Sequence, residues 1–80
     1  MKLQKGSVVR AAAGRDSGGL FVVTDVQKNC CFIADGKSRK LESPKRKNIK
    51  HISLTNSMID LNDITDKKLR RLLKELKDAE

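Results

Sequence analysis

Aromatic side chains are almost missing from this 80-residue chain. It contains no tryptophan and no tyrosine, and its only phenylalanines are Phe21 and Phe32. Both lie in apolar segments typical of buried strands, so we expect both in the core. Proteins that read unpaired bases do so largely on exposed aromatic rings. The scarcity of such rings therefore argues against a surface built for stacking.

Long apolar runs are absent as well. The longest is residues 30–34, far too short to cross a bilayer, and residues 1–6 lead into no apolar segment of the kind found in signal peptides. We therefore expect no membrane partner and a cytoplasmic location.

Cysteine is limited to Cys30 and Cys31, which are neighbours in the sequence. Two sulfurs cannot complete a zinc site of four ligands, and a disulfide between adjacent residues is strained. We expect both residues to behave as small buried hydrophobic side chains in a reducing compartment.

The residue patterns of enzymes are also missing. The chain has a single histidine, His51, and it has no arrangement of Ser, His and acid, no metal-ligand cluster and no Walker sequence. The glycines between residues 14 and 19 lack the GxGxxG spacing of a dinucleotide site. We expect no catalysis, no cofactor and no small-molecule substrate.

What the chain does have is positive charge, and it is concentrated. The net charge is +8. Residues 37–59 carry seven Lys and Arg against one Glu, which gives +6, whereas residues 1–36 give +2 and residues 60–80 sum to zero. A chain that is basic only for solubility would spread its lysines. The distribution predicts a directed cationic surface and a polyanionic partner.

Short strands are predicted wherever β-branched and apolar residues run between turn residues. The predicted strands are residues 7–12, 20–26, 31–34, 40–42 and 48–54, with a further short one at 58–61. Asp35-Gly36, after the third strand, is a strong hairpin sequence. Between the first two strands, Gly14, Gly18 and Gly19 supply the positive φ values that a tight turn needs.

Residues 66–78 predict an amphipathic helix. Its leucines share one face because they are spaced at i, i+3, i+4 and i+7; they are Leu69, Leu72, Leu73 and Leu76. Thr65 is a natural N-cap, and Ile64 before it can pack on Leu69 as a hydrophobic staple.

The predicted fold is mainly β: a small barrel over residues 1–62, with the helix in residues 63–80 packed on it. A chain of 80 residues forms one small domain, which buries about 60% of the surface of its unfolded chain. Burial of the leucine face against a partner or a second copy is the alternative.

Residues 6–18, Gly-Ser-Val-Val-Arg-Ala-Ala-Ala-Gly-Arg-Asp-Ser-Gly, are similar to a KOW motif. The Asp35-Gly36 turn, the basic segment 45–52 (Lys-Arg-Lys-Asn-Ile-Lys-His-Ile) and the terminal helix follow in order. Over nearly its whole length, the chain resembles the archaeal and eukaryotic-type large-subunit ribosomal proteins of the family numbered fourteen. The resemblance implies an SH3-like β-barrel of the KOW type that binds RNA, chiefly ribosomal RNA, without catalysis. A peptide-binding SH3 role is not expected, because polyproline grooves are lined by aromatic rings.

Arginine grips phosphate through paired N–H bonds and lysine acts as a mobile point charge, so the basic residues are candidate contacts to RNA. The candidate RNA-binding residues are Arg15, Lys37, Arg39, Lys40, Lys45, Arg46, Lys47, Asn48, Lys50 and His51. We expect the glycine-rich turn to have a structural role, carried by Gly14, Asp16, Gly18 and Gly19. The alternative is an anion-binding concavity of backbone N–H groups with Arg15 at its mouth. A solvated run of charge, with His51 merely structural, is the alternative interpretation.

Three functions remain open at this stage. The first is contact with structured ribosomal RNA through the basic segment and the KOW hairpin. The second is an adaptor that docks its leucine helix on ribosomal proteins or on other proteins of the translation or transcription machinery. The third is non-specific compaction of DNA.

Overall fold

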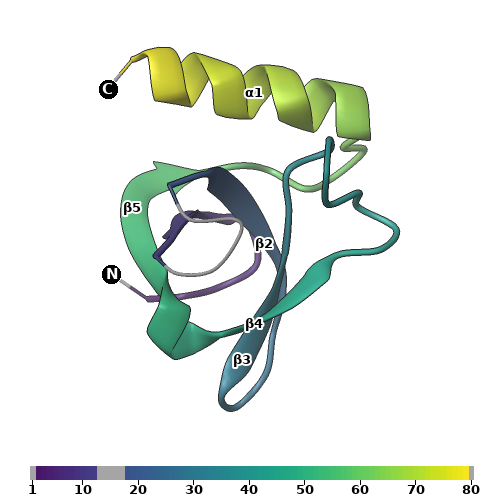
Figure 1. Ribbon diagram of the computed structural model, residues 1–80. Coiled ribbons are helices and arrows are strands. Elements are labelled where there is room, and N and C mark those ends of the chain that lie inside the picture. The colour runs from purple at the N-terminus through teal and green to yellow at the C-terminus, as the bar shows by residue number, and fades with distance from the viewer. Residues whose placement is uncertain (1, 13–17, 80) are drawn as a thin grey trace.

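The computed structural model describes residues 2–12 and 18–79. Within them the chain forms five strands, one 3-10 turn and one α-helix (Figure 1). In chain order the elements are β1 (Ser7–Ala11), β2 (Leu20–Val26), β3 (Cys30–Ala34), β4 (Lys45–Asn48), η1 (Ile49–His51), β5 (Ile52–Met58) and α1 (Asp66–Asp78).

The strands form one antiparallel sheet in the order β4-β3-β2-β1-β5, so β4 and β5 are its two edges. In a flat sheet these edges would lie about 19 Å apart, four spacings of about 4.8 Å. The chain joins them through η1, whose 3 residues span only about 6 Å at about 2 Å per residue. The sheet must therefore curl until the end of β4 and the start of β5 come close together, which gives the ring of strands seen in Figure 1. The fold is a small barrel-like one.

Two backbone hydrogen bonds hold the curled sheet at η1. The N–H of Ala12, just after β1, donates to the carbonyl of His51 at 2.8 Å. The N–H of Ile49 donates to the carbonyl of Asn29, in the turn between β2 and β3, at 3.2 Å. The 3-10 turn is thus bonded to two other parts of the sheet.

Irregular pairing bends the strands. The register of β2 on β3 shifts between Val23 and Asp25, and there the hydroxyl of Thr24 donates to the carbonyl of Phe32 at 3.3 Å. A second shift occurs between β1 and β5, where the hydroxyl of Thr55 donates to the carbonyl of Val8 at 2.7 Å. Such bulges increase local twist, which a strongly curled sheet of few strands requires.

Both faces of β1, β2 and β3 are buried, in two separate clusters. The first contains Val9, Ala11, Phe21, Val23, Cys31 and Ile33, with Leu3, Val26 and Ile52 beside it. The second contains Val8, Leu20, Val22, Ala34, Ile59, Leu69 and Leu73, with Leu41, Leu61, Ile64, Leu72 and Leu76 beside it. Because the second cluster includes the helix, it lies on the outside of the barrel and the first fills the inside.

The predicted helix is confirmed with its bounds, Asp66–Asp78. The hydroxyl of Thr65 accepts the N–H of Lys68 at 3.1 Å, which is the expected N-cap. Leu69 and Leu73 are buried and Leu72 and Leu76 are half-buried against the second cluster. The leucine face therefore packs on the barrel of its own chain, and α1 crosses the outside of the ring (Figure 1).

The predicted strand at residues 40–42 is wrong. That segment is a turn, and the edge strand is β4, which begins directly after Pro44. The N–H of Leu41 donates to Oδ1 of Asp66 at 2.8 Å, and the Leu41 side chain packs under α1. These contacts, which no local pattern reveals, hold residues 40–42 out of the sheet. The hairpin expected at Asp35-Gly36 is accordingly a long connection, residues 35–44.

The two last predicted strands are also corrected. Of the predicted strand 48–54, residue 48 ends β4 and only residues 52–54 belong to β5. Residues 49–51 form η1, and Oδ1 of Asn48 caps this turn by accepting the N–H of Lys50 at 2.9 Å. Residues 58–61 form no separate strand: Met58 is the last residue of β5, and the N–H of the buried Ile59 donates to the Gly6 carbonyl at 2.8 Å just beyond it.

Smaller shifts affect the first and third strands. The first ends at Ala11 instead of residue 12, and the third starts at Cys30 instead of residue 31. Gly18 has the expected positive φ, but Gly19 does not. The Gly19 carbonyl already accepts the N–H of Ala11 at 3.1 Å, next to the β1–β2 ladder.

Gly36 is where the 35–44 connection touches the helix, and we expect Gly36→Ala to be strongly destabilising. Its φ is +78°, and an added Cβ would collide with the Asp66 carbonyl oxygen. Left-handed strain of about 1–2 kcal/mol and steric strain of about 1–3 kcal/mol should together lower the free energy of unfolding by about 2–5 kcal/mol in urea melts.

The matched control is Gly18→Ala. Gly18 has a φ of +85°, but nothing lies within 4 Å of an added Cβ. This variant should lose only the left-handed strain, about 1–2 kcal/mol. Equal losses in the two variants would contradict the proposed contact.

Candidate nucleic-acid interface

The candidate residues of the basic segment are spread over three parts of the fold. Lys37, Arg39 and Lys40 lie in the 35–44 connection; Lys45, Arg46, Lys47 and Asn48 form β4; Lys50 and His51 belong to η1. The KOW residues Gly14, Arg15 and Asp16 lie outside the described residues. Gly18 is described: its φ is +85°, and its carbonyl accepts from Nη1 of Arg10 at 2.9 Å.

Asp35 organises the first of these parts. Its Oδ1 accepts the backbone N–H groups of Lys37 and Arg39, both at 2.8 Å. The Arg39 carbonyl in turn accepts the N–H groups of Asp35 at 2.9 Å and of Gly36 at 3.0 Å. The carboxylate is thus bound to backbone, as in an Asx turn, and the loop it folds places Lys37 beside the helix.

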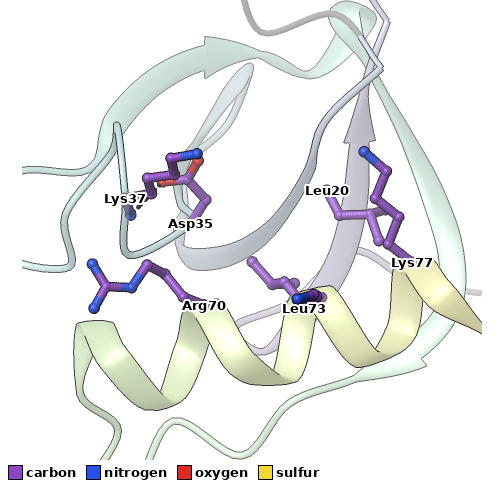
Figure 2. Close-up of a pocket in the computed structure, with 7 residues that line it drawn as sticks. Leu20, Asp35, Lys37, Arg70, Leu73 and Lys77 are labelled. Carbon is purple, nitrogen blue, oxygen red and sulfur yellow. Dashed lines mark hydrogen bonds between the residues drawn. The ribbon is translucent and has the colours of Figure 1, made fainter.

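A cleft of about 340 Å³ opens between this loop and α1 (Figure 2). Its lining residues are Leu20, Asp35, Lys37, Arg70, Leu73, Lys74 and Lys77. Leu20 and Leu73 form an apolar floor, and the cations come from two segments far apart in the sequence. We call this the loop–helix cleft.

Register decides which side chains of β4 face outward. Phe32 pairs with Arg46 and Cys30 pairs with Asn48, so these four side chains share one face of the sheet. Lys45 and Lys47 lie on the other face, opposite Ile33 and Cys31 respectively. The basic run of β4 therefore divides, and only Arg46 and Asn48 join the outer face.

Phe32 is not in the core, contrary to the sequence prediction. Phe21 is buried as expected, with 3% of its surface exposed, but Phe32 is only half-buried and belongs to neither apolar cluster. The outer face that carries it is covered by α1 near Ala34 and open near Arg46. One aromatic ring is therefore partly available to solvent beside an arginine.

Two adjoining clefts flank the open end of this face. One is lined by Asn29, Cys30, Arg46 and Asn48, and the other by Lys28, Asn29, Asn48, Ile49 and Lys50. They share Asn29 and Asn48, and neither has an acidic residue among these lining residues. We call their basic and amide residues, Lys28, Asn29, Arg46, Asn48 and Lys50, the η1 surface.

The η1 surface is held by hydrogen bonds within rigid elements. Nε of Arg46 donates to Sγ of Cys30 at 3.4 Å, which fixes the guanidinium against β3. Asn48 holds Lys50 through the cap of η1, and His51 supplies the carbonyl that accepts from Ala12. The backbone of His51 thus serves the fold, while its side chain is exposed.

Residues that the sequence analysis did not select contribute to both surfaces. Lys28 and Asn29 come from the turn between β2 and β3, which pairing places beside η1. On α1, Arg70, Lys74 and Lys77 repeat at i, i+4 and i+7 and so share one side of the helix. Their spacing was visible in the sequence, but the zero net charge of residues 60–80 concealed it.

The helix has a further cleft near its N-terminal end, lined by Thr65, Lys67, Lys68 and Arg71. All of its cations come from one element. Within residues 2–12 and 18–79, no group of three or more His, Cys, Asp or Glu side chains gathers as a metal ion would require. In the same residues, no helix combines the length and apolar character needed to cross a membrane.

The adjacent cysteines are free thiols that occupy opposite faces of β3. Cys31 lies inside the barrel with 0% of its surface exposed, and Cys30 is 6% exposed behind Arg46. Their expected burial is confirmed. Burial, and secondarily the charge of neighbouring Cys30, raises the pKa of the Cys31 thiol above its ordinary value.

Cys31 should make the fold sensitive to alkaline pH. Because its pKa is higher in the folded than in the unfolded chain, the unfolded chain releases this proton first. The stability that the protonated thiol provides is complete below the unfolded pKa of about 8.5 and is lost as the pH rises through the folded pKa. Urea melts from neutral pH upward should show the free energy of unfolding falling above about pH 8.5.

Cys31→Ala should remove this alkaline slope, whereas Cys30→Ala should keep most of it, because burial is the larger cause. An unchanged slope in Cys31→Ala would assign the effect to other groups.

The sequence was also compared with known proteins. A scan against models of known protein families gives no match, and a search of curated proteins gives no significant relative.

Proposed function

We propose that this protein is a non-catalytic RNA-binding module, an SH3-like barrel of the KOW type that contacts structured RNA through its η1 surface. The observation that carries the proposal is the pair of adjoining clefts lined by Lys28, Arg46 and Lys50 together with amides, with no acid among their lining residues. Such a surface attracts phosphate, and its position on a strand end and a capped turn keeps it rigid.

Charge and hydrogen-bonding capacity are combined there in a way that suits RNA. Arg46 offers a planar set of N–H donors, held by Cys30, and the lysines supply point charges on either side. Asn29 and Asn48 carry amides that suit ribose hydroxyls and base edges. Phosphate contacts position the RNA, and the amides add discrimination.

Phe32 adds a stacking element to this surface. It lies next to Arg46 across the β3–β4 pair, and Asp25 lies opposite it on the β2 side. The phosphate path therefore follows β4 and η1, away from the carboxylate of Asp25. A base unstacked from a folded RNA would find the ring beside the cations. The favoured ligand is thus a structured RNA with an unpaired base, and the resemblance to the ribosomal family favours ribosomal RNA.

The adaptor function finds less support. It requires the leucine face of α1 to be free, whereas Leu69 and Leu73 are buried against the barrel. DNA compaction would use the same cations without the amides or Phe32. Equal affinity for duplex DNA and for a ribosomal RNA hairpin at about 0.15 M salt would favour DNA compaction over the RNA-binding proposal.

The double variant Arg46→Gln/Lys50→Gln tests the η1 surface. With two phosphate contacts removed, affinity for a ribosomal RNA hairpin should fall by about tenfold or more, and the slope of log K against log salt should be shallower by about 1.4–1.8. Fluorescence anisotropy over a salt series measures both quantities. The matched control is Lys2→Gln/Lys5→Gln, which removes the same charge from exposed positions outside the clefts. Equal losses in the two variants would reduce the effect to net charge and would contradict the proposal.

Phe32 gives a second test. Phe32→Leu should weaken binding to a hairpin with a bulged base by about 1–3 kcal/mol, the usual contribution of stacking on one base, whereas Phe32→Tyr should retain it. Binding to a fully paired duplex should change little in either variant. The same anisotropy titrations report the result, with thermal melting to verify the fold. Identical affinities for Phe32→Leu and wild type on the bulged hairpin would exclude stacking.

A further inference from the structure

We propose that the loop–helix cleft is a second site for RNA backbone, so that a single barrel bridges two RNA segments. The inference rests on the proposed RNA-binding function and extends it from one surface to two. It concerns residues that the sequence analysis assigned to no site, apart from Lys37.

Positively charged side chains from two parts of the chain converge on the loop–helix cleft. Lys37 reaches the cleft from the 35–44 connection, and Arg70, Lys74 and Lys77 line it from α1 (Figure 2). The three helical cations lie along one side of the helix over about 10 Å, at 1.5 Å per residue. That length spans several phosphates of a nucleic-acid strand.

Cations outnumber carboxylates in the lining of the cleft, where Lys37, Arg70, Lys74 and Lys77 stand against one acidic side chain, Asp35. Oδ1 of Asp35 accepts two backbone N–H groups, and Oδ1 of the half-buried Asp66 accepts the N–H of Leu41. Within residues 2–12 and 18–79, no ion pair joins Arg70, Lys74 or Lys77 to a carboxylate. The lining therefore carries four cations against one carboxylate, a net charge of +3, which attracts an anion from outside.

The two walls of the loop–helix cleft are held rigidly against each other. Gly36 packs closely against the Asp66 carbonyl and the Arg70 side chain, and Leu41 is bonded to Asp66. The loop and the helix thus hold a fixed relative position before any ligand arrives. Leu20 and Leu73, with 8% and 5% of their surface exposed, close the floor. A preformed site loses less entropy on binding than one that must be assembled.

The loop–helix cleft lies apart from the η1 surface. The η1 surface and the loop–helix cleft share no residue. Figure 1 shows α1 and η1 at opposite ends of a molecule whose extents are 28 × 26 × 25 Å. Since charges interact only over about 8 Å at physiological ionic strength, the two surfaces act independently. The two surfaces can therefore bind two separate RNA segments, and they do not require one continuous RNA strand.

A bridging assay tests this inference. A biotinylated RNA hairpin is fixed on streptavidin beads, and the same hairpin with fluorescein is added together with the full chain. Wild type should retain the fluorescent hairpin on the beads. The variant Arg70→Gln/Lys74→Gln/Lys77→Gln should retain at least about tenfold less, although its binding to one free hairpin changes by only about twofold. The variant Arg46→Gln/Lys50→Gln should also lose bridging.

The matched control is Lys67→Gln/Lys68→Gln/Arg71→Gln, which removes the same charge from the separate cleft near the N-terminal end of α1. It should bridge as well as wild type, and an equal loss would overturn the assignment to the loop–helix cleft. Bridging that persists in the Arg70/Lys74/Lys77 variant, through dimers visible by analytical ultracentrifugation, would also overturn it. Wild type that binds one hairpin but never two would refute this inference alone, whereas wild type that binds no RNA would refute the proposed function as well.

Discussion

The whole fold depends on one short connection between the two edges of the sheet. Because η1 spans so little distance, β4 and β5 cannot stay at opposite sides, and the sheet must curl. Curling gives every strand an inner and an outer face. The inner faces of β1, β2 and β3 fill a core, and their outer faces need a cover, which α1 supplies. The same connection brings the turn between β2 and β3 beside η1, so the barrel's closure and the η1 surface arise from the same residues.

Elements with strong local patterns could be read from the sequence. The helical spacing of its leucines and the Thr65 cap defined α1 to the residue, and the β-branched runs located β1, β2 and β3 within one residue at each end. Residues 35–51 could not be read in this way. Their conformation depends on the hydrogen bond from Leu41 to Asp66 and on the cap that Asn48 gives to a 3-10 turn. Each of these groups has other possible hydrogen-bond partners, and only the folded barrel determines which partner it meets.

The candidate site was predictable in kind more than in arrangement. The concentration of cations between residues 37 and 50 located much of the positive charge of the clefts. The sequence alone did not show which face of the sheet each of these side chains occupies. Pairing with β3 sends Arg46 outward and Lys47 to the other side. Net charge is a sum and carries no direction, which is why the neutral C-terminal segment hid the cations of α1. Phe32 is predicted to lie in the core because its neighbours are apolar, but α1 covers the outer face near Ala34 and leaves it open near Arg46.

In the connection between β3 and β4, the residues that hold the backbone differ from those that face the solvent. Its backbone is held by Oδ1 of Asp35, by the close packing of Gly36 on α1 and by the bond from Leu41 to α1, while Lys37 and Lys40 are exposed. Exchange of the exposed side chains can alter the electrostatic character of the molecule while the architecture stays constant. An added or deleted residue would move the helix itself. Divergence along this stretch is therefore expected in the chemistry of its side chains and not in its length.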